Sequence, residues 1–139
     1  MTRTRVRFGE TDAAGIVFYP TFFAWFDVGA TGLLRAASGA MLGAEGRPRW
    51  PVPIVEAGAS FSAPLYYDDA IAIRTTVVDV GSSSLRLEHV VVRGETEAAR
   101  GFEVRVYVGY VDGGIRARTI PDDLRRALAE ETSSEDEVA

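Results

Sequence analysis

The sequence contains no cysteine and no lysine, and its only histidine is His89. Without cysteine, thiol nucleophiles, disulfides and thiolate metal sites are excluded. Without lysine there is no Schiff-base chemistry, and all fifteen cationic side chains are arginines. A zinc site around one histidine would need carboxylates for its other ligands, so no metal is expected. The groups that remain for catalysis are carboxylates, hydroxyls, arginines, His89 and backbone dipoles.

Long hydrophobic runs are also missing. No stretch approaches the roughly 18 to 20 apolar residues that a membrane-spanning helix requires. The basic start, MTRTRVRF, has no apolar signal segment behind it, so we expect a cytoplasmic protein without membrane contact. The net charge of −5 arises from five acidic residues between Glu130 and Glu137, and the rest of the chain is neutral. A neutral body without a basic face argues against nucleic-acid binding.

Hydrophobic patterning divides the chain into a few elements within one globular domain, expected over residues 1–128. An apolar helix is predicted over 21–39, because Phe22, Phe26 and Leu33 recur at helical spacing and charges are few. β-branched and aromatic segments predict strands, and an amphipathic helix follows them. The predicted strands span 3–8, 52–63, 69–80, 84–93 and 99–111, the second helix spans 119–131, and 129–139 are expected to form a disordered acidic tail.

One long helix and about five antiparallel strands predict an α+β fold in which the sheet wraps around the helix. Pro20 suits the first turn of this helix, since its missing N–H has no intrahelical partner there. Gly39 suits the exit of the helix. Such a sheet has long edges and only one helix to cover it, so we expect two copies to pair through an edge strand.

The loop RFGETDAAGIVFYP, residues 7–20, places Asp12 shortly before the long helix. Backbone N–H groups at a helix start carry partial positive charge and can polarise a carbonyl or stabilise an oxyanion. A carboxylate beside them could attack that carbonyl or activate water. The same residues also suit a structural loop, in which Asp12 caps the helix or holds the turn and Gly15 adopts a positive φ. Spacing alone leaves both interpretations open.

The stretch RFGETDAAGIVFYPTFFAWFD resembles the opening of the 4-hydroxybenzoyl-CoA thioesterase family, whose signature reads F-G-x-x-D-x-A-G-I-V-x-Y-P. PIVEAGASFSAPLYYDD is similar to the family's second and third strands, and LEHVVVR is similar to its fourth. The resemblance covers roughly residues 3–125. It implies a hotdog fold and hydrolysis of an aromatic acyl-CoA without a metal or redox cofactor. It also implies a homodimer that assembles into a homotetramer.

Carried over residue by residue, the resemblance implies that Asp12 is the catalytic carboxylate, as nucleophile or general base. It also implies that the backbone N–H of Tyr19 binds the thioester carbonyl. The acyl ring is expected to lie between aromatic side chains, completed by residues of a neighbouring subunit. The residues implied to shape or contact the acyl site are Gly15, Phe18, Phe22, Trp25 and Asp27.

The chain departs from this family where basic residues would meet the CoA phosphates, because the matching turn is Gly81-Ser82-Ser83. The arginines that could replace them are Arg47, Arg49, Arg74 and Arg86, and a carrier-protein thioester is an alternative substrate. A hotdog dehydratase, which would need His89, and a noncatalytic acyl-thioester binding module are further alternatives. Glu10 is expected to be solvated, and His89 to be a satisfied core residue.

Overall fold

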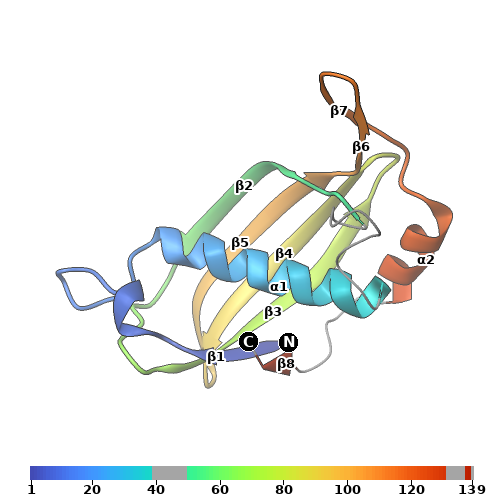
Figure 1. Ribbon diagram of the computed structural model, residues 1–139. Coiled ribbons are helices and arrows are strands. Elements are labelled where there is room, and N and C mark those ends of the chain that lie inside the picture. The colour runs from blue at the N-terminus through green and yellow to red at the C-terminus, as the bar shows by residue number, and fades with distance from the viewer. Residues whose placement is uncertain (39–49, 131–136, 139) are drawn as a thin grey trace.

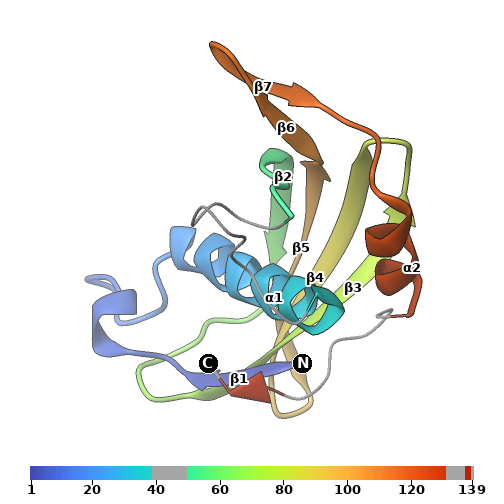
Figure 2. The ribbon, with the colours of Figure 1, turned by 45° about the vertical axis from the view of Figure 1, so that its right-hand side comes forward.

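A curved sheet wraps around one long helix (Figures 1 and 2). The computed structural model describes residues 1–38, 50–130 and 137–138. Its elements are β1 (Thr2–Arg5), the 3-10 helix η1 (Phe8–Glu10), α1 (Pro20–Ser38), β2 (Ile54–Phe61), β3 (Ala70–Val80), β4 (Ser84–Arg93), β5 (Thr96–Val106), β6 (Val108–Val111), β7 (Gly114–Ala117), α2 (Asp122–Glu130) and β8 (Glu137–Val138). The strand order is β2-β5-β4-β3-β1-β8, in which only β1 and β8 are parallel. The predicted α+β class is confirmed.

Helix α1 occupies the concave side of the sheet because most of its residues are apolar. It begins at Pro20, one residue before the predicted start at 21, and the predicted exit at Gly39 lies outside the described residues. Two glycines allow the close approach. A Cβ on Gly29 would collide with Thr75 Oγ1 of β3, and one on Gly101 of β5 would collide with the ring of Phe26. The backbone of α1 therefore lies against side chains of the sheet at Gly29, and the Phe26 ring lies against the backbone of β5 at Gly101.

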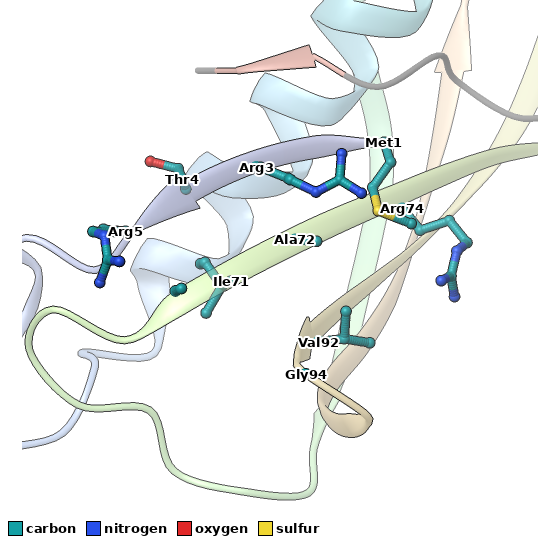
Figure 3. Close-up of a pocket in the computed structure, with 10 residues that line it drawn as sticks. Met1, Arg3, Thr4, Arg5, Ile71, Ala72, Arg74, Val92 and Gly94 are labelled. Carbon is teal, nitrogen blue, oxygen red and sulfur yellow. The ribbon is translucent and has the colours of Figure 1, made fainter.

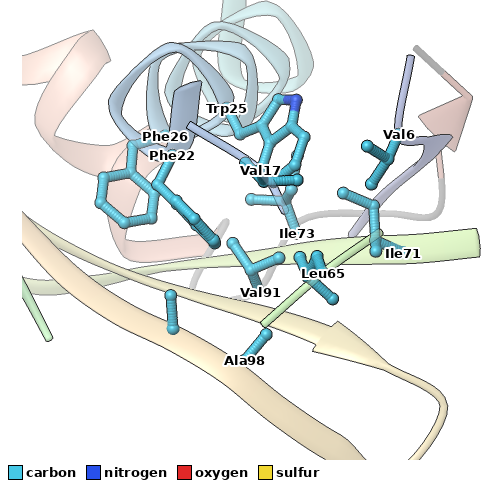
Figure 4. Packing of buried hydrophobic residues seen from close by; sticks show 11 residues of the cluster. Val6, Val17, Phe22, Trp25, Phe26, Leu65, Ile71, Ile73, Val91 and Ala98 are labelled. Atoms are coloured by element: carbon cyan, nitrogen blue, oxygen red, sulfur yellow. The ribbon is translucent and has the colours of Figure 1, made fainter. Parts of the chain in front are cut away.

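Two hydrophobic clusters hold the two halves of α1. Figure 4 shows the first, in which Phe22, Trp25 and Phe26 meet side chains of the sheet such as Ile73 and Val91. In the second cluster, later residues of α1 pack with β4 and with helix α2, and its largest members are Trp50, Ile120, Leu33, Leu34, Leu85, Leu87, Leu124 and Leu128. Both ends of the helix are thereby fixed against the sheet.

Several strand boundaries differ from the predictions. The predicted strand over 3–8 ends at Arg5, because the Arg7 N–H donates to the Glu10 carboxylate at 2.7 Å and starts the η1 turn instead. The predicted strand over 52–63 begins only at Ile54, after Pro53, which has no N–H for the ladder. The chain from β4 turns tightly at Gly94, where φ is 61°, so that β5 begins at Thr96 and not at 99.

The predicted strand over 99–111 is two strands, β5 and β6, separated at Tyr107. β6 pairs with β7 in a hairpin that the sequence reading missed, although Gly113 and Gly114 supply the positive φ values of its turn. The C-terminal helix is shorter than predicted, from Asp122 to Glu130. No helix in the described ranges is long and apolar enough to cross a membrane.

Candidate functional site

The loop between β1 and α1 folds back on itself in a tight turn. The Asp12 N–H donates to the Ile16 carbonyl at 2.9 Å, and the Gly15 N–H donates to the Asp12 carbonyl at 2.9 Å. Gly15 has a φ of 84°, as predicted, in the region that favours glycine. The Val17 N–H donates to the Leu65 carbonyl at 2.9 Å, which attaches the loop to the segment after β2.

The Asp12 carboxylate is exposed at this turn. Its Oδ1 accepts a hydrogen bond from the Ala14 N–H at 2.8 Å, so the side chain holds its own turn and does not cap α1. Its other oxygen accepts no hydrogen bond from the described part of the chain. An exposed carboxylate with one oxygen available can attack a carbonyl carbon or accept a proton from water.

The start of α1 presents a backbone donor beside this loop. Pro20 has no N–H, and the Phe18 N–H already donates to the Glu10 carbonyl at 2.9 Å. The Tyr19 N–H between them has no acceptor among residues 1–38, 50–130 and 137–138. It lies at the positive end of the helix dipole, where a carbonyl oxygen would find a preformed donor.

An apolar pocket of about 400 Å³ opens beside Tyr19. Phe22 of α1 and Phe61 at the end of β2 form its aromatic walls, with ring centroids 5.0 Å apart. The Tyr19 and Phe61 rings lie 6.5 Å apart, edge to face. The remaining lining comes from the Asp12 loop and the segment after β2, at Ile16, Val17, Ser62, Ala63, Pro64 and Leu65.

The other residues that the sequence indicated lie around this pocket at different depths. Phe18 is exposed, with its ring 5.4 Å from that of Tyr19. Trp25 is buried behind Phe22, at 5.2 Å between ring centroids, and does not line the pocket. Asp27 lies about 1.4 turns beyond Phe22 on α1, does not line the pocket, and is bound to Arg105 at 3.1 Å.

Glu10 is the clearest correction to the sequence reading, which expected a solvated side chain. Its side chain is only 13% exposed. Its carboxylate accepts the indole N–H of Trp25 at 3.1 Å and the backbone N–H of Arg7 at 2.7 Å. Glu10 therefore ties the loop to α1, a tertiary contact that no local sequence pattern reveals.

A row of polar side chains crosses the core beneath α1. Thr75 Oγ1 lies 2.8 Å from His89 Nδ1, and His89 Nε2 lies 2.9 Å from Glu103 Oε1. Arg105 donates to both oxygens of Glu103, at 3.1 and 3.2 Å, and to Asp27 at 3.1 Å. The prediction that His89 is a satisfied core residue is confirmed, since it is fully buried with two partners.

Burial alone would raise the pKa of the Glu103 carboxyl, but hydrogen bonds from His89 and Arg105 outweigh it and hold this pKa below its ordinary value. Glu103 is therefore ionised at neutral pH. Sequence reasoning missed this row. Its signal was present in β5, where strand alternation puts Glu103 and Arg105 on one face, the same face as His89 of β4.

A larger hollow, of about 650 Å³, lies elsewhere, on the outer side of β1 and β3 (Figure 3). Arg3, Arg5 and Arg74 line it above a floor that includes Ala70 and Ala72. Arg74, one of the arginines considered for the CoA phosphates, lines this hollow, but Asp12, Tyr19 and the residues expected around the acyl group do not, so volume alone does not identify the active site. Arg86, another arginine considered for CoA, lies 4.2 Å above the Phe102 ring, whereas Arg47 and Arg49 lie outside the described residues.

The wrapped helix, with a Tyr19 N–H that lacks an acceptor in the described chain, an aromatic pocket beside this N–H and an exposed carboxylate on the preceding loop, has the architecture of the hotdog enzymes that act on acyl thioesters. The chain belongs to the thioesterase-like superfamily, whose family model matches residues 6–128. Both the family expected from the sequence and the assignment as a thioester hydrolase are thereby confirmed.

Characterised relatives extend over most of the chain. It is 31% identical to 4-hydroxybenzoyl-CoA thioesterase of Pseudomonas sp. (strain CBS-3), over 86% of this chain and 89% of that protein. It is 27% identical to 1,4-dihydroxy-2-naphthoyl-CoA hydrolase of Synechococcus sp. (strain WH7803), over 89% of this chain and 84% of that protein. The structure of a gentisyl-coenzyme A thioesterase is similar with a TM-score of 0.76 and 34% identity, over 93% of this chain and 99% of that one.

Proposed function

We propose that this thioesterase hydrolyses an aromatic acyl-CoA to the free acid and CoA. The observation that carries the proposal is the Tyr19 N–H, which lacks an acceptor in the described chain and borders a pocket walled by Phe22 and Phe61. The ring of an aryl thioester would lie against these aromatic walls, with its carbonyl oxygen on the Tyr19 N–H. The names of the three relatives, all acting on aromatic acyl-CoA thioesters, support the same substrate class.

Asp12 supplies the chemistry in this proposal, by either of two routes. As nucleophile, its free oxygen bonds to the thioester carbon, the C–S bond breaks, and the CoA thiolate leaves and takes up a proton. Water then hydrolyses the resulting anhydride and restores the carboxylate. As general base, Asp12 removes a proton from water, which attacks the same carbon; the C–S bond then breaks, and the CoA thiolate leaves and takes up that proton. In both routes the Tyr19 N–H stabilises the negative charge that develops on the carbonyl oxygen.

The proposal assigns the remaining predicted residues supporting positions. Gly15 lets the Asp12 turn form, and Phe18 extends the aromatic wall at the pocket mouth. Trp25 supports Phe22 from behind. We expect Asp27, which is bound to Arg105 and does not line this pocket, to support the acyl site from further along α1.

We propose that the protein is a dimer formed through β2. This strand pairs only with β5 among the described strands, so its other edge is open. It exposes the apolar side chains Ile54, Val55 and Phe61, with 44%, 63% and 48% of their surface accessible. Open apolar edges of this kind pair with another chain, and a two-fold axis closes the assembly after two copies. Assembly of two such dimers into a tetramer stays a prediction.

The experiment is a panel of benzoyl, 4-hydroxybenzoyl, phenylacetyl, hydroxynaphthoyl and straight-chain acyl-CoA thioesters, with release of free thiol as the readout. We expect the aromatic thioesters to have the highest kcat/KM. Faster turnover of straight-chain or carrier-protein thioesters would contradict the substrate class. A product that keeps its thioester would instead indicate a dehydratase, and binding without any thiol release would indicate a noncatalytic module.

A further inference from the structure

The hollow on the outer side of β1 and β3 has no role in the site described above, although three arginines line it (Figure 3). Arg3 lies opposite Ala72 in the register of the two strands, and Arg5 lies opposite Ala70. Arg74 follows Ala72 by two residues, so it is on the same face of β3. The small side chains of the two alanines leave the space between these arginines open.

The described part of the chain balances this positive charge only in part. Arg5 Nη1 lies 3.7 Å from the Asp68 carboxylate, but both side chains are exposed, so the pair is weak. Asp69 is bound to Arg93 instead, at 3.0 Å. Arg74 is exposed and makes no hydrogen bond or ion pair with residues 1–38, 50–130 or 137–138. The hollow therefore offers positive charge to an anionic ligand.

Apolar surface lies next to the arginines. Val92 of β4 is opposite Ala72, and Met1 and Gly94 also line the hollow. Its volume of about 650 Å³ is in the range of small-molecule sites, which combine an apolar lining with a few polar groups. A guanidinium group binds two phosphate oxygens at once. A nucleotide has both parts that this hollow suits, phosphate groups for the arginines and a flat base for the apolar wall.

The hollow and the Tyr19 pocket are joined by one short segment. Leu65 lines the pocket and Ala70 lines the hollow, and five residues span at most about 18 Å. The segment is folded more tightly than this limit, because the Asp69 N–H donates to the Tyr66 carbonyl at 3.1 Å. The arm of CoA has about 13 covalent bonds between sulfur and the first phosphorus, against about 15 backbone bonds in five residues. A thioester held at Tyr19 can therefore bring its phosphates to this hollow.

We propose that the hollow lined by Arg3, Arg5 and Arg74 binds the phosphate groups of a nucleotide. The nucleotide end of the CoA thioester and a free nucleotide present the same phosphate chemistry, and the experiments below separate these two sources. For the CoA thioester, the inference rests on the proposed function. The turn Gly81-Ser82-Ser83 carries no positive charge, and Arg86 lies over the Phe102 ring, so neither replaces this hollow as a phosphate site.

The first test compares 4-hydroxybenzoyl-CoA with 4-hydroxybenzoyl-pantetheine, which has the same acyl group and thioester but no phosphate. In the double variant Arg3→Gln and Arg74→Gln, KM for the CoA thioester is expected to rise about 10-fold or more at unchanged kcat, because hydrogen bonds from charged groups are lost. The kinetics of the pantetheine thioester are expected to stay the same. Arg74 is exposed and has no partner in the described chain, so the single variant Arg74→Gln is informative if the double variant does not fold.

Arg126→Gln is the matched control, because this exposed residue of α2 loses the same charge and does not line the hollow. It is expected to leave KM for both thioesters unchanged.

The second test measures the Kd of adenosine 3′,5′-bisphosphate by isothermal titration calorimetry, so it needs no turnover. We expect the wild type to bind this nucleotide and the double variant to bind it about 10-fold or more weakly. Added salt is expected to weaken binding to the wild type more than to the variant, since the variant has fewer charges to screen.

The outcomes separate the sources and the proposals. A rise in KM for the CoA thioester alone identifies the substrate as the nucleotide bound in the hollow. Weaker bisphosphate binding with unchanged KM for both thioesters identifies a free nucleotide. Unchanged KM together with unchanged or absent bisphosphate binding overturns the proposal, and so does an equal rise in KM for both thioesters. If the wild type releases no thiol, the proposed function fails, and calorimetry still decides whether the hollow binds a nucleotide.

Discussion

The indole N–H of Trp25 donates a 3.1 Å hydrogen bond to the carboxylate of Glu10, fifteen residues earlier in the chain. The same carboxylate accepts the Arg7 N–H, so one side chain joins the η1 turn to the first turns of α1. This contact sets where the Asp12 loop begins relative to the start of the helix.

Replacing Glu10 with Ala is expected to destabilise the fold by about 1–3 kcal/mol, because the buried Trp25 N–H loses its acceptor. Urea unfolding followed by tryptophan fluorescence measures this change. Glu95→Ala, in the exposed turn between β4 and β5, is the matched control, with an expected effect within about 0.5 kcal/mol. If the two variants had the same free energy of unfolding, the contact between Glu10 and Trp25 would contribute nothing to stability.

Replacing Asp12 with Asn or Ala is expected to lower kcat by about 10²–10⁴-fold while the fold persists, because the exposed carboxylate contributes only a local hydrogen bond to Ala14. Thiol release measures the rate, and circular dichroism verifies the fold. Asp112→Asn, in the turn between β6 and β7, controls for the loss of a surface carboxylate. Turnover close to that of the wild type in either Asp12 variant would exclude a catalytic role for this residue.

Replacing Gly29 with Ala is expected to destabilise the protein by about 1–3 kcal/mol, because the new methyl group would collide with Thr75 Oγ1. Helix propensity alone predicts the opposite sign, a gain of about 1 kcal/mol. Gly9→Ala, where an added Cβ meets no atom within 4 Å, provides the comparison. Thermal unfolding of both variants shows whether Gly29→Ala raises or lowers the stability. A raised Tm for Gly29→Ala would refute the close packing of α1 on β3.

Replacing Glu103 with Gln is expected to cost about 3 kcal/mol at pH 7, because Arg105 and His89 lose a buried anion. The folded-state pKa of Glu103 lies below its ordinary value of 4.5, so its ionisation stabilises the fold above that pH. As the pH falls below about 4.5, this contribution is lost. The gap in unfolding free energy between wild type and variant should therefore narrow on acidification, and a gap that is constant from about pH 7 to about pH 3 would contradict the lowered pKa.

Replacing Val55 with Arg is expected to weaken the β2 dimer, because the interface would then have to bury a charge where it now covers an exposed apolar side chain. Analytical ultracentrifugation should show a shift toward the monomer mass of 15.0 kDa. Val78→Arg introduces the same charge on β3, at a side chain 44% exposed, and should leave the association state unchanged. A Val55 variant that associates like the wild type would place the interface elsewhere.

The sequence was most informative where structure is local. The spacing of Phe22, Phe26 and Leu33 predicted α1 within a residue of its ends as described, because helical periodicity is a property of neighbouring positions. The motif around Asp12 and Gly15 located the loop for the same reason. The β6–β7 hairpin was missed although its turn glycines are adjacent in the sequence, since β5 and β6 together have the composition of one long strand.

Contacts between distant residues were not predictable in this way. Asp27 and Arg105 are 78 positions apart, and only the wrapping of the sheet around α1 brings them together. His89 and Glu103 were each assigned to strands, but their pairing depends on the register of β4 against β5. Register follows from the packing of many side chains and cannot be read from any one of them.

The close seating of α1 at Gly29 and Gly101 has a consequence for how the enzyme can diverge. Gly29 of α1 faces Thr75 Oγ1 of β3, and the Phe26 ring of α1 faces Gly101 of β5. Neither contact has room for an added atom, so we expect the start of α1, with the Tyr19 N–H, to keep its position relative to the sheet. New acyl groups must be accommodated by exchanging side chains in the Asp12 loop and along β2, while the carbonyl anchor stays in place. Substrate range and catalytic geometry can then change independently.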